Sequence, residues 1–186
     1  MKLKNTPENV EKAKLQIAED LGINPENITF IPQFDFHIDM SYRPLHNGEI
    51  AVPDYEEGIR ILKETQISGM DEAAKSELIK QLEEFSAKSA AIRSEAEQAL
   101  SDSGYKIVKM PCFSDSGKAK INYMNGVGGT SKTGKSFYIT NKSDYPELNE
   151  AVQKYFKNTG IDKIYFVSTQ PFLNNYGSID CITQEV

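Results

Sequence analysis

The clearest structural signal in the sequence lies in residues 145–168, which read YPELNEAVQKYFKNTGIDKIYFVS. Proline stands at the second position, as it does at the start of many helices, and apolar residues then recur at helical spacing. Gly160 ends this pattern, and the β-branched and aromatic run after it is typical of a strand. The stretch predicts a helix over 145–158 and a strand over 163–168, which indicates an α/β fold.

An earlier stretch follows the same plan. A helix is predicted over 7–21 and a short strand over 28–31, again separated by a Gly-Ile dipeptide. Each copy leads into a segment with a reactive side chain, His37 after the first and Cys181 after the second. Repeats of one such unit around a centre would bring His37 and Cys181 into a shared pocket.

The rest of the chain is expected to alternate between strands and one long helical region. Further strands are predicted over 34–42, 49–52, 105–108, 120–124, 136–140 and 177–183. Residues 55–103 are rich in Glu, Lys, Ala, Ser and Gln and predict a helical hairpin that is broken near Ser68 and Gly69. Its alternating charges are typical of a solvated helical face, and a protein partner on this hairpin is the alternative.

Composition limits the class of protein. The 186 residues carry 27 acidic and 21 basic side chains, a net charge of −6, and this argues against a protein that binds duplex nucleic acid. The 18 Phe and Tyr residues disfavour disorder, and no apolar run approaches the roughly 20 residues that a membrane helix needs. The N-terminal sequence shows no secretory signal, so we expect a cytoplasmic protein, with export by a signal-less route as the alternative. The length fits one domain over residues 1–186.

Few residues could carry chemistry. The two cysteines and two histidines show no spacing typical of a zinc site and cannot form a disulfide framework, so no metal or organic cofactor is predicted. Cys112 lies between Pro111 and Phe113, where a buried inert thiol is the expected state. Cys181 follows a Gly-Ser turn near the C-terminus and is the candidate nucleophile, although inert burial is the commoner fate of a cysteine.

Three ionisable residues alternate in one short segment. Asp35, His37 and Asp39 would point to one face of an extended chain, because side chains at i, i+2 and i+4 of a strand share a face. Three such groups are costly to bury in an apolar core. They therefore predict either the lining of a polar cavity or a solvated surface strand.

Residues 129–136, GTSKTGKS, match the pattern of a phosphate-binding loop. In such a loop the Lys-Ser pair opens a helix, whereas here it leads into the β-rich run Phe137–Thr140. We therefore predict a polar hairpin loop at these residues, with nucleotide binding as the less favoured interpretation.

Three segments together resemble the guanidine-modifying pentein enzymes, most closely the branch of agmatine deiminase and bacterial peptidylarginine deiminase. Phe36–Met40 resembles the H-x-D motif of that family, Tyr123–Asn125 its Tyr-x-Asn segment, and Gly177–Gln184 its terminal nucleophile segment. The three occur in the family's order. One departure is Asp180, which stands where the family usually has histidine before the nucleophile.

The resemblance implies a fold and a reaction. The fold would be the carboxyl-terminal part of a pentein, an α/β propeller of ββαβ units, with the hairpin 55–103 as an insertion. Cys181 would attack the guanidinium carbon of arginine, agmatine or peptidyl-arginine, and His37 would act as acid and then as base. Asp39, Asp35 and Asn125 would bind the substrate. Asp35 or Asp54 could replace a further carboxylate that the family supplies upstream.

Two alternatives remain open from the sequence. An amidinotransferase would use the same residues and differ only in the nucleophile that resolves the covalent intermediate. A non-catalytic interaction module, which presents the hairpin 55–103 on an incomplete pentein scaffold, would use none of them.

Overall fold

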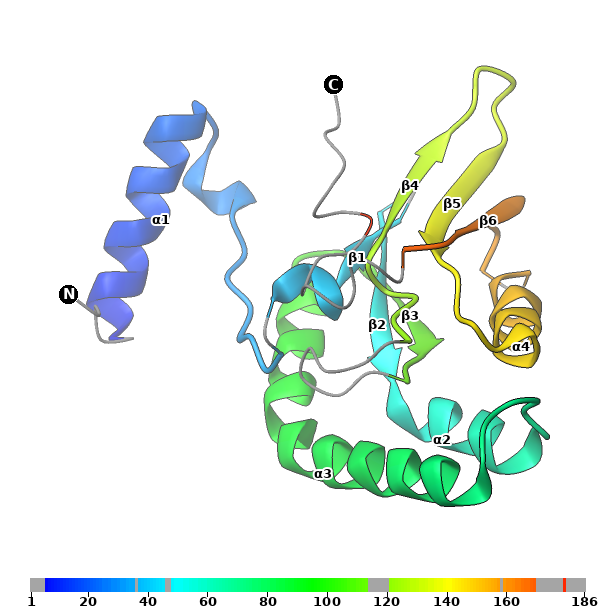
Figure 1. Ribbon diagram of the computed structural model, residues 1–186. Coiled ribbons are helices and arrows are strands. Elements are labelled where there is room, and N and C mark those ends of the chain that lie inside the picture. Colours follow the sequence, from blue (N-terminus) through cyan, green and yellow to red (C-terminus); the bar gives the residue numbers. More distant parts are fainter. Residues whose placement is uncertain are drawn as a thin grey trace. The chain divides into compact units, whose positions relative to one another are not determined.

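A computed structural model describes residues 6–35, 37–45, 48–113, 121–157, 159–169 and 179 (Figure 1). The chain separates into two compact units, residues 1–31 and 32–186. The architecture is mixed α/β, with two three-stranded sheets and four α-helices among the described residues. None of the helices that the structure describes is both long and apolar enough to cross a membrane.

The first unit contains the predicted N-terminal helix, α1 (Pro7–Leu21), and one 3-10 turn, η1 (Pro25–Asn27). The Thr6 side chain accepts a hydrogen bond from the amide of Asn9, and Gly22 ends the helix with a φ of 64°, so both ends are capped as the sequence indicated. The strand predicted over 28–31 is wrong. These residues pair with no other described segment, and an apolar run becomes a strand only beside a partner.

The second unit holds the first sheet, in the strand order β1-β2-β3. Strand β1 (Arg43–Pro44) is antiparallel to β2 (Glu49–Asp54), and β2 is parallel to β3 (Lys106–Pro111). A parallel neighbour requires a crossover, which is supplied here by helices α2 (Tyr55–Glu64) and α3 (Glu72–Asp102).

The crossover helices have defined starts and a common contact. Asp54 and Asp71 accept hydrogen bonds from the backbone amides of Glu57 and Ala74 and so cap α2 and α3. The helices flank a break at residues 65–71, and the rings of Tyr55 and Phe85 meet edge to face at 5.5 Å. Residues 55–103 are thus mostly helical, and their interpretation as an insertion stays a prediction.

The second sheet, β4-β5-β6, repeats the topology of the first (Figure 1). Strand β4 (Gly126–Thr130) is antiparallel to β5 (Ser136–Asn141), and β5 is parallel to β6 (Lys163–Val167) through helix α4 (Pro146–Phe156). Helix α4 and β6 confirm the elements predicted from residues 145–168. The repeated unit is therefore ββαβ, which occurs at 126–167 with one crossover helix and at 43–111 with two. The first copy of the repeat that the sequence predicted, at residues 7–31, is wrong, because 28–31 form no strand. A larger propeller built from such units stays a prediction.

The strand predicted over 120–124 is wrong, because residues 121–125 form a turn and the strand begins at Gly126. Strand β4 contains three glycines in five residues, a composition with low strand propensity. Its pairing with β5 holds these residues in a strand conformation that their composition does not favour. The aromatic ring of Phe137 lies beside Gly129, where a Cβ atom would come within 2.8 Å of the ring, and so occupies the space that a side chain would fill.

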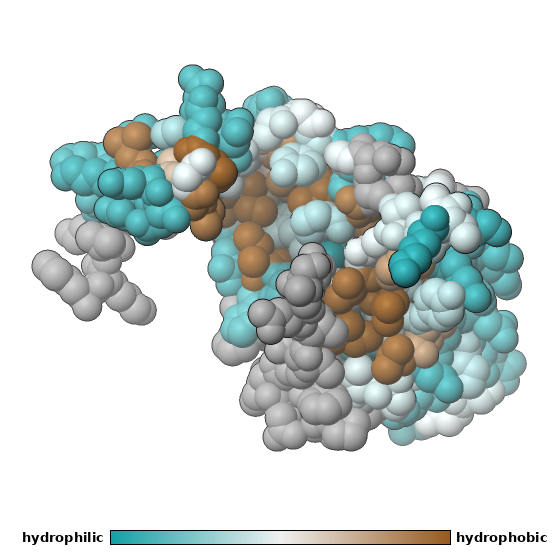
Figure 2. Space-filling model, turned by 90° about the horizontal axis from the view of Figure 1, so that it is seen from above, coloured by the Kyte–Doolittle hydropathy of each residue, from teal (hydrophilic) through white to brown (hydrophobic). Residues whose placement is uncertain are grey.

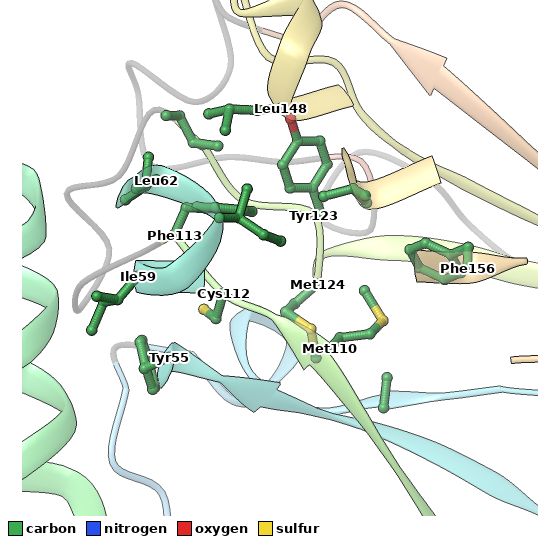
Figure 3. Close-up of a cluster of buried hydrophobic side chains, with 14 of the residues drawn as sticks. Tyr55, Ile59, Leu62, Met110, Cys112, Phe113, Tyr123, Met124, Leu148 and Phe156 are labelled. Carbon is green, nitrogen blue, oxygen red and sulfur yellow. The ribbon is translucent and has the colours of Figure 1, made fainter. Parts of the chain in front are cut away.

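A single hydrophobic core joins the two ββαβ units (Figure 3). Its fully buried side chains include Leu62 of α2, Met110 of β3, Leu148 of α4 and Tyr138 of β5. Cys112 lies in this core with 3% of its surface exposed, as the sequence predicted. In β6 the side chains of Tyr165 and Val167 each remain 44% exposed. Figure 2 shows apolar residues between polar ones on one face of the molecule.

Helix α2 packs so closely on Cys112, the residue after β3, that one position of the helix accepts no side chain. A Cβ atom at Gly58 would lie 2.1 Å from the carbonyl oxygen of Cys112. Although alanine is the better helix former by about 1 kcal/mol, Gly58→Ala is expected to lower the free energy of unfolding by about 2 kcal/mol or more through this overlap. Urea unfolding measures the change. The exposed Ser76→Ala in α3 is the control, and a Gly58→Ala protein as stable as this control would contradict the packing.

Candidate functional site

The segment with the H-x-D motif is a turn and not the strand predicted over 34–42. Ile38–Met40 forms one 3-10 turn, η2, for which His37 is the N-cap residue. The backbone amides of Ser41 and Tyr42 donate to the carbonyl of Ile38 at 3.1 and 2.9 Å, so they close the turn instead of pairing with another strand. The alternation that would have placed three side chains on one face is therefore absent.

The turn holds His37 and Asp39 beside each other. Nδ1 of His37 lies 3.9 Å from Oδ1 of Asp39, close enough for electrostatic attraction to a protonated imidazole but too far for a hydrogen bond. The His37 side chain is 52% exposed and that of Asp39 is 22% exposed. Both groups can therefore meet a ligand that comes from solvent.

The sequence predicted that Asp35 would share one face with His37 and Asp39, but the structure buries it. Its Oδ2 accepts a hydrogen bond of 2.9 Å from the hydroxyl of Ser41. Burial raises the pKa of Tyr55 above its ordinary value, and the neighbouring Cys112 and Asp35 add to this effect. Asp54, the other carboxylate considered from the sequence, caps α2.

Asn125 lies directly on Asp39. Its side-chain nitrogen donates to Oδ2 of Asp39 at 2.6 Å, across 86 residues of sequence. Asn122 adds a second link between the same two segments, because its side-chain nitrogen donates to the carbonyl of Met40 at 3.2 Å. His37, Asp39 and Asn125 thus form one cluster, which we call the Asp39 site.

The turn at residues 122–125 is held in one conformation by its own amides and by strand β5. Oδ1 of Asn122 accepts hydrogen bonds from the backbone amides of Met124 and Asn125 at 2.8 and 2.9 Å. Each carbonyl of the turn accepts from a side chain of β5, and the donors are Tyr138, Thr140 and Asn141. Asn125 has no exposed surface, so its side-chain amide donates to Asp39 from a buried turn whose backbone is held by these hydrogen bonds.

Asn141 and Thr169 were not identified from the sequence. Both are buried at 2% exposure, and the Thr169 hydroxyl donates to the side-chain oxygen of Asn141. The only signal available was a pair of polar residues, Thr140 and Asn141, at the end of an otherwise apolar strand. That signal does not distinguish a buried network from an exposed strand end.

The loop that resembles a phosphate-binding motif is a β-hairpin, as predicted. It joins β4 to β5, and the amides of Gly134 and Lys135 donate to the backbone and hydroxyl oxygens of Ser131 at 2.9 and 3.1 Å. A phosphate loop directs such amides at its ligand and continues into a helix. Here they are used within the hairpin, which continues into a strand, so the loop lacks the geometry of a nucleotide site.

A separate groove of about 450 Å³ lies between α2 and α4. Its charged lining includes Glu57, Arg60, Glu64, Glu147 and Lys154. A hydrogen bond from the Arg60 side chain holds the pKa of Glu57 below its ordinary value. None of the residues of the Asp39 site lines this groove.

Cys181, the candidate nucleophile, lies outside the described residues, as do Phe36 and Asp180. Within the terminal segment the structure describes Ile179, which is 5% exposed. The shared pocket for Cys181 and His37 therefore stays a prediction.

No family model matches the sequence, and no curated protein matches it. Among solved structures, the agmatine deiminase of C. jejuni with bound substrate is similar to this chain, with a TM-score of 0.46 and 16% sequence identity. The similarity covers 92% of this chain and 44% of the agmatine deiminase chain, so this chain spans less than half the length of that structure.

Proposed function

We propose that the protein hydrolyses a guanidinium group of arginine or an arginine derivative to a ureido group and releases ammonia. The observation that carries this proposal is the 2.6 Å hydrogen bond from Asn125 to Asp39, with His37 beside the same carboxylate. It joins two of the three segments that resemble the guanidine-modifying enzymes.

Asp39 has the chemistry to recognise a guanidinium group. A guanidinium is a planar fork of N–H donors, and a carboxylate accepts two such donors side by side. A carboxylate offers about four acceptor positions, so the bond from Asn125 is compatible with further bonds from a substrate. The bond from Asn125 also fixes the plane of the carboxylate, which is the property that paired hydrogen bonds require.

The proposed reaction uses two further groups. The thiolate of Cys181 attacks the guanidinium carbon, and His37 donates a proton to the departing nitrogen, which leaves as ammonia. Water then attacks the covalent thiouronium carbon while His37 accepts a proton from it, and the carbon–sulfur bond breaks to regenerate the thiolate. The balance is one guanidinium and one water converted to one ureido group and one ammonium ion.

A cationic substrate suits this sequence of steps. A cysteine thiol has an ordinary pKa near 8.5, so at neutral pH it needs a positive neighbour to become a thiolate. The bound guanidinium supplies that charge at the point of attack.

Product analysis tests the proposal. The full chain is incubated with agmatine, arginine and an arginyl peptide, and the ureido product and ammonia are measured with and without an added amine acceptor. We expect both products in equal amounts from at least one substrate, whether or not the amine is present. Transfer of the amidino group to the amine would indicate an amidinotransferase. A folded chain that forms neither product would overturn the proposal and favour an interaction module.

A further inference from the structure

We propose that Asn141 is the positioning residue of the Asp39 site, an inference that rests on the proposed function. Asn141 is the last residue of β5, is 2% exposed, and contacts neither His37 nor Asp39 through any of the hydrogen bonds described above. Its side chain instead joins two other segments, the turn at 122–125 and the connection that follows β6.

The amide nitrogen of Asn141 holds both ends of the turn. It donates to the carbonyl of Asn122 at 2.6 Å and to the carbonyl of Asn125 at 3.1 Å. Since carbonyl oxygens only accept hydrogen bonds, this end of the side chain must be the nitrogen, and the oxygen must face the other way. Both donors of the amide therefore maintain the spacing between the first and last residues of the turn.

The amide oxygen of Asn141 holds the connection after β6. It accepts a hydrogen bond from the hydroxyl of Thr169, which is also 2% exposed. In the sequence this connection leads from the second sheet toward Cys181. One side chain thus ties the start of that connection to the turn that carries Asn125.

Two routes lead from Asn141 to the segment with Asp39. One passes through Asn125, whose side chain donates to the Asp39 carboxylate, and the other through Asn122, whose side chain donates to the Met40 carbonyl. The first route fixes the carboxylate and the second fixes the backbone next to it. A shift of the 122–125 turn would therefore move both partners of Asp39 together.

Burying a network of amide side chains in a core costs free energy. Each buried polar group loses its hydrogen bonds to water, and this loss is offset only if hydrogen bonds within the protein replace them. Apolar side chains would fill the same space without that requirement, whereas the asparagines impose directions. The direction imposed here is the approach of Asn125 to Asp39.

The substitution Asn141→Asp tests the inference with almost no change of shape. A carboxylate keeps an acceptor for Thr169 but loses both donors to the turn. We expect kcat/KM for guanidine hydrolysis to fall by about 100-fold, as expected for a displacement of about 1 Å in a site of this kind. The side-chain amide signals of Asn125 in a 15N-correlated NMR spectrum are expected to lose the shift that a hydrogen bond to a carboxylate produces.

Asn149→Asp is the matched control. Asn149 is also buried, and its nitrogen donates to two carbonyls, those of Ser143 and Tyr145, at 2.9 and 3.1 Å. Its oxygen accepts from a backbone amide and from the Tyr123 hydroxyl, and an aspartate oxygen can accept both bonds, so the contact of this position with the 122–125 turn is kept. The same chemical change at this position is expected to lower stability. The Asn125 signals are expected to keep their positions, and the activity of the folded protein is expected to stay within about 3-fold of that of the unchanged chain.

Thr169 supplies a second, milder test. Thr169→Val keeps the shape and removes the hydroxyl, whereas Thr169→Ser keeps the hydroxyl, so we expect a fall of about 10-fold in kcat/KM for valine and recovery with serine. If Asn141→Asp does not fold, the comparison of Thr169→Val with Thr169→Ser tests the positioning role of Asn141 instead. Equal effects of Asn141→Asp and Asn149→Asp on the Asn125 signals would overturn the inference. An inactive unchanged chain whose Asn125 signals respond as expected would instead reject the proposed function and leave the positioning intact.

Discussion

Cys181→Ser is expected to lower the rate of ureido product formation by about 10³-fold or more, because a serine hydroxyl is a far weaker nucleophile at neutral pH than a thiolate. The rate of ammonia release is measured on the folded variant with the best substrate of the unchanged chain. The fall should appear in kcat, since the covalent step itself is removed.

Cys112→Ala is the control for this experiment. The Cys112 sulfur lies in the apolar core with 3% of the residue exposed, so its loss removes packing and not chemistry. We expect the activity of the folded protein to be retained, with a loss of about 1 kcal/mol in the free energy of unfolding. If Cys112→Ala rather than Cys181→Ser abolished the reaction, the assignment of the nucleophile would be wrong.

Asp39→Asn is expected to reduce kcat/KM by about 10³-fold, because a neutral amide cannot balance the charge of a guanidinium. Asp39 is the carboxylate that we propose binds the substrate, and its Oδ2 accepts a hydrogen bond from Asn125. The measurement is steady-state kinetics with the guanidine substrate, on protein whose folding is verified by circular dichroism.

Asp35→Asn distinguishes the two carboxylates that the sequence placed together. Asp35 is buried and accepts from Ser41, and an asparagine oxygen can accept the same bond. Its substitution is therefore expected to change stability, while the activity of each folded molecule stays within about 3-fold. Equal losses for Asp35→Asn and Asp39→Asn would show that both carboxylates contact the substrate.

The helices could be predicted from the sequence because their signals are local. Thr6 and Gly22 cap α1, and Pro146 opens α4, so these three ends are marked by residues within one turn of them. Strands need a partner that the sequence does not mark. Residues 28–31 have an apolar strand pattern but no described partner, whereas β4 has a glycine-rich pattern and a complete ladder with β5.

The site was predicted in part, for a related reason. The resemblance to known enzymes named Asp39 and Asn125, but periodicity could not indicate that residues 86 positions apart form a hydrogen bond. The residues around His37 form a turn and not the expected strand, because the amides of Ser41 and Tyr42 donate to the nearby carbonyl of Ile38. Asn141 and Thr169 act through single contacts with distant backbone and side-chain groups, and a contact of that kind leaves no pattern in the sequence.

Covalent labelling of Cys181 tests the central claim, that a guanidinium-binding carboxylate lies in reach of the nucleophile. A haloacetamidine carries the planar cation that Asp39 would bind, and a haloacetamide of the same size is neutral. Mass spectrometry of the labelled chain gives the rate at Cys181 for each reagent. We predict a preference of at least about 10-fold for the cationic reagent in the unchanged chain, equivalent to about 1.4 kcal/mol, and its loss in Asp39→Asn. Equal rates with the two reagents in the unchanged chain would contradict the account.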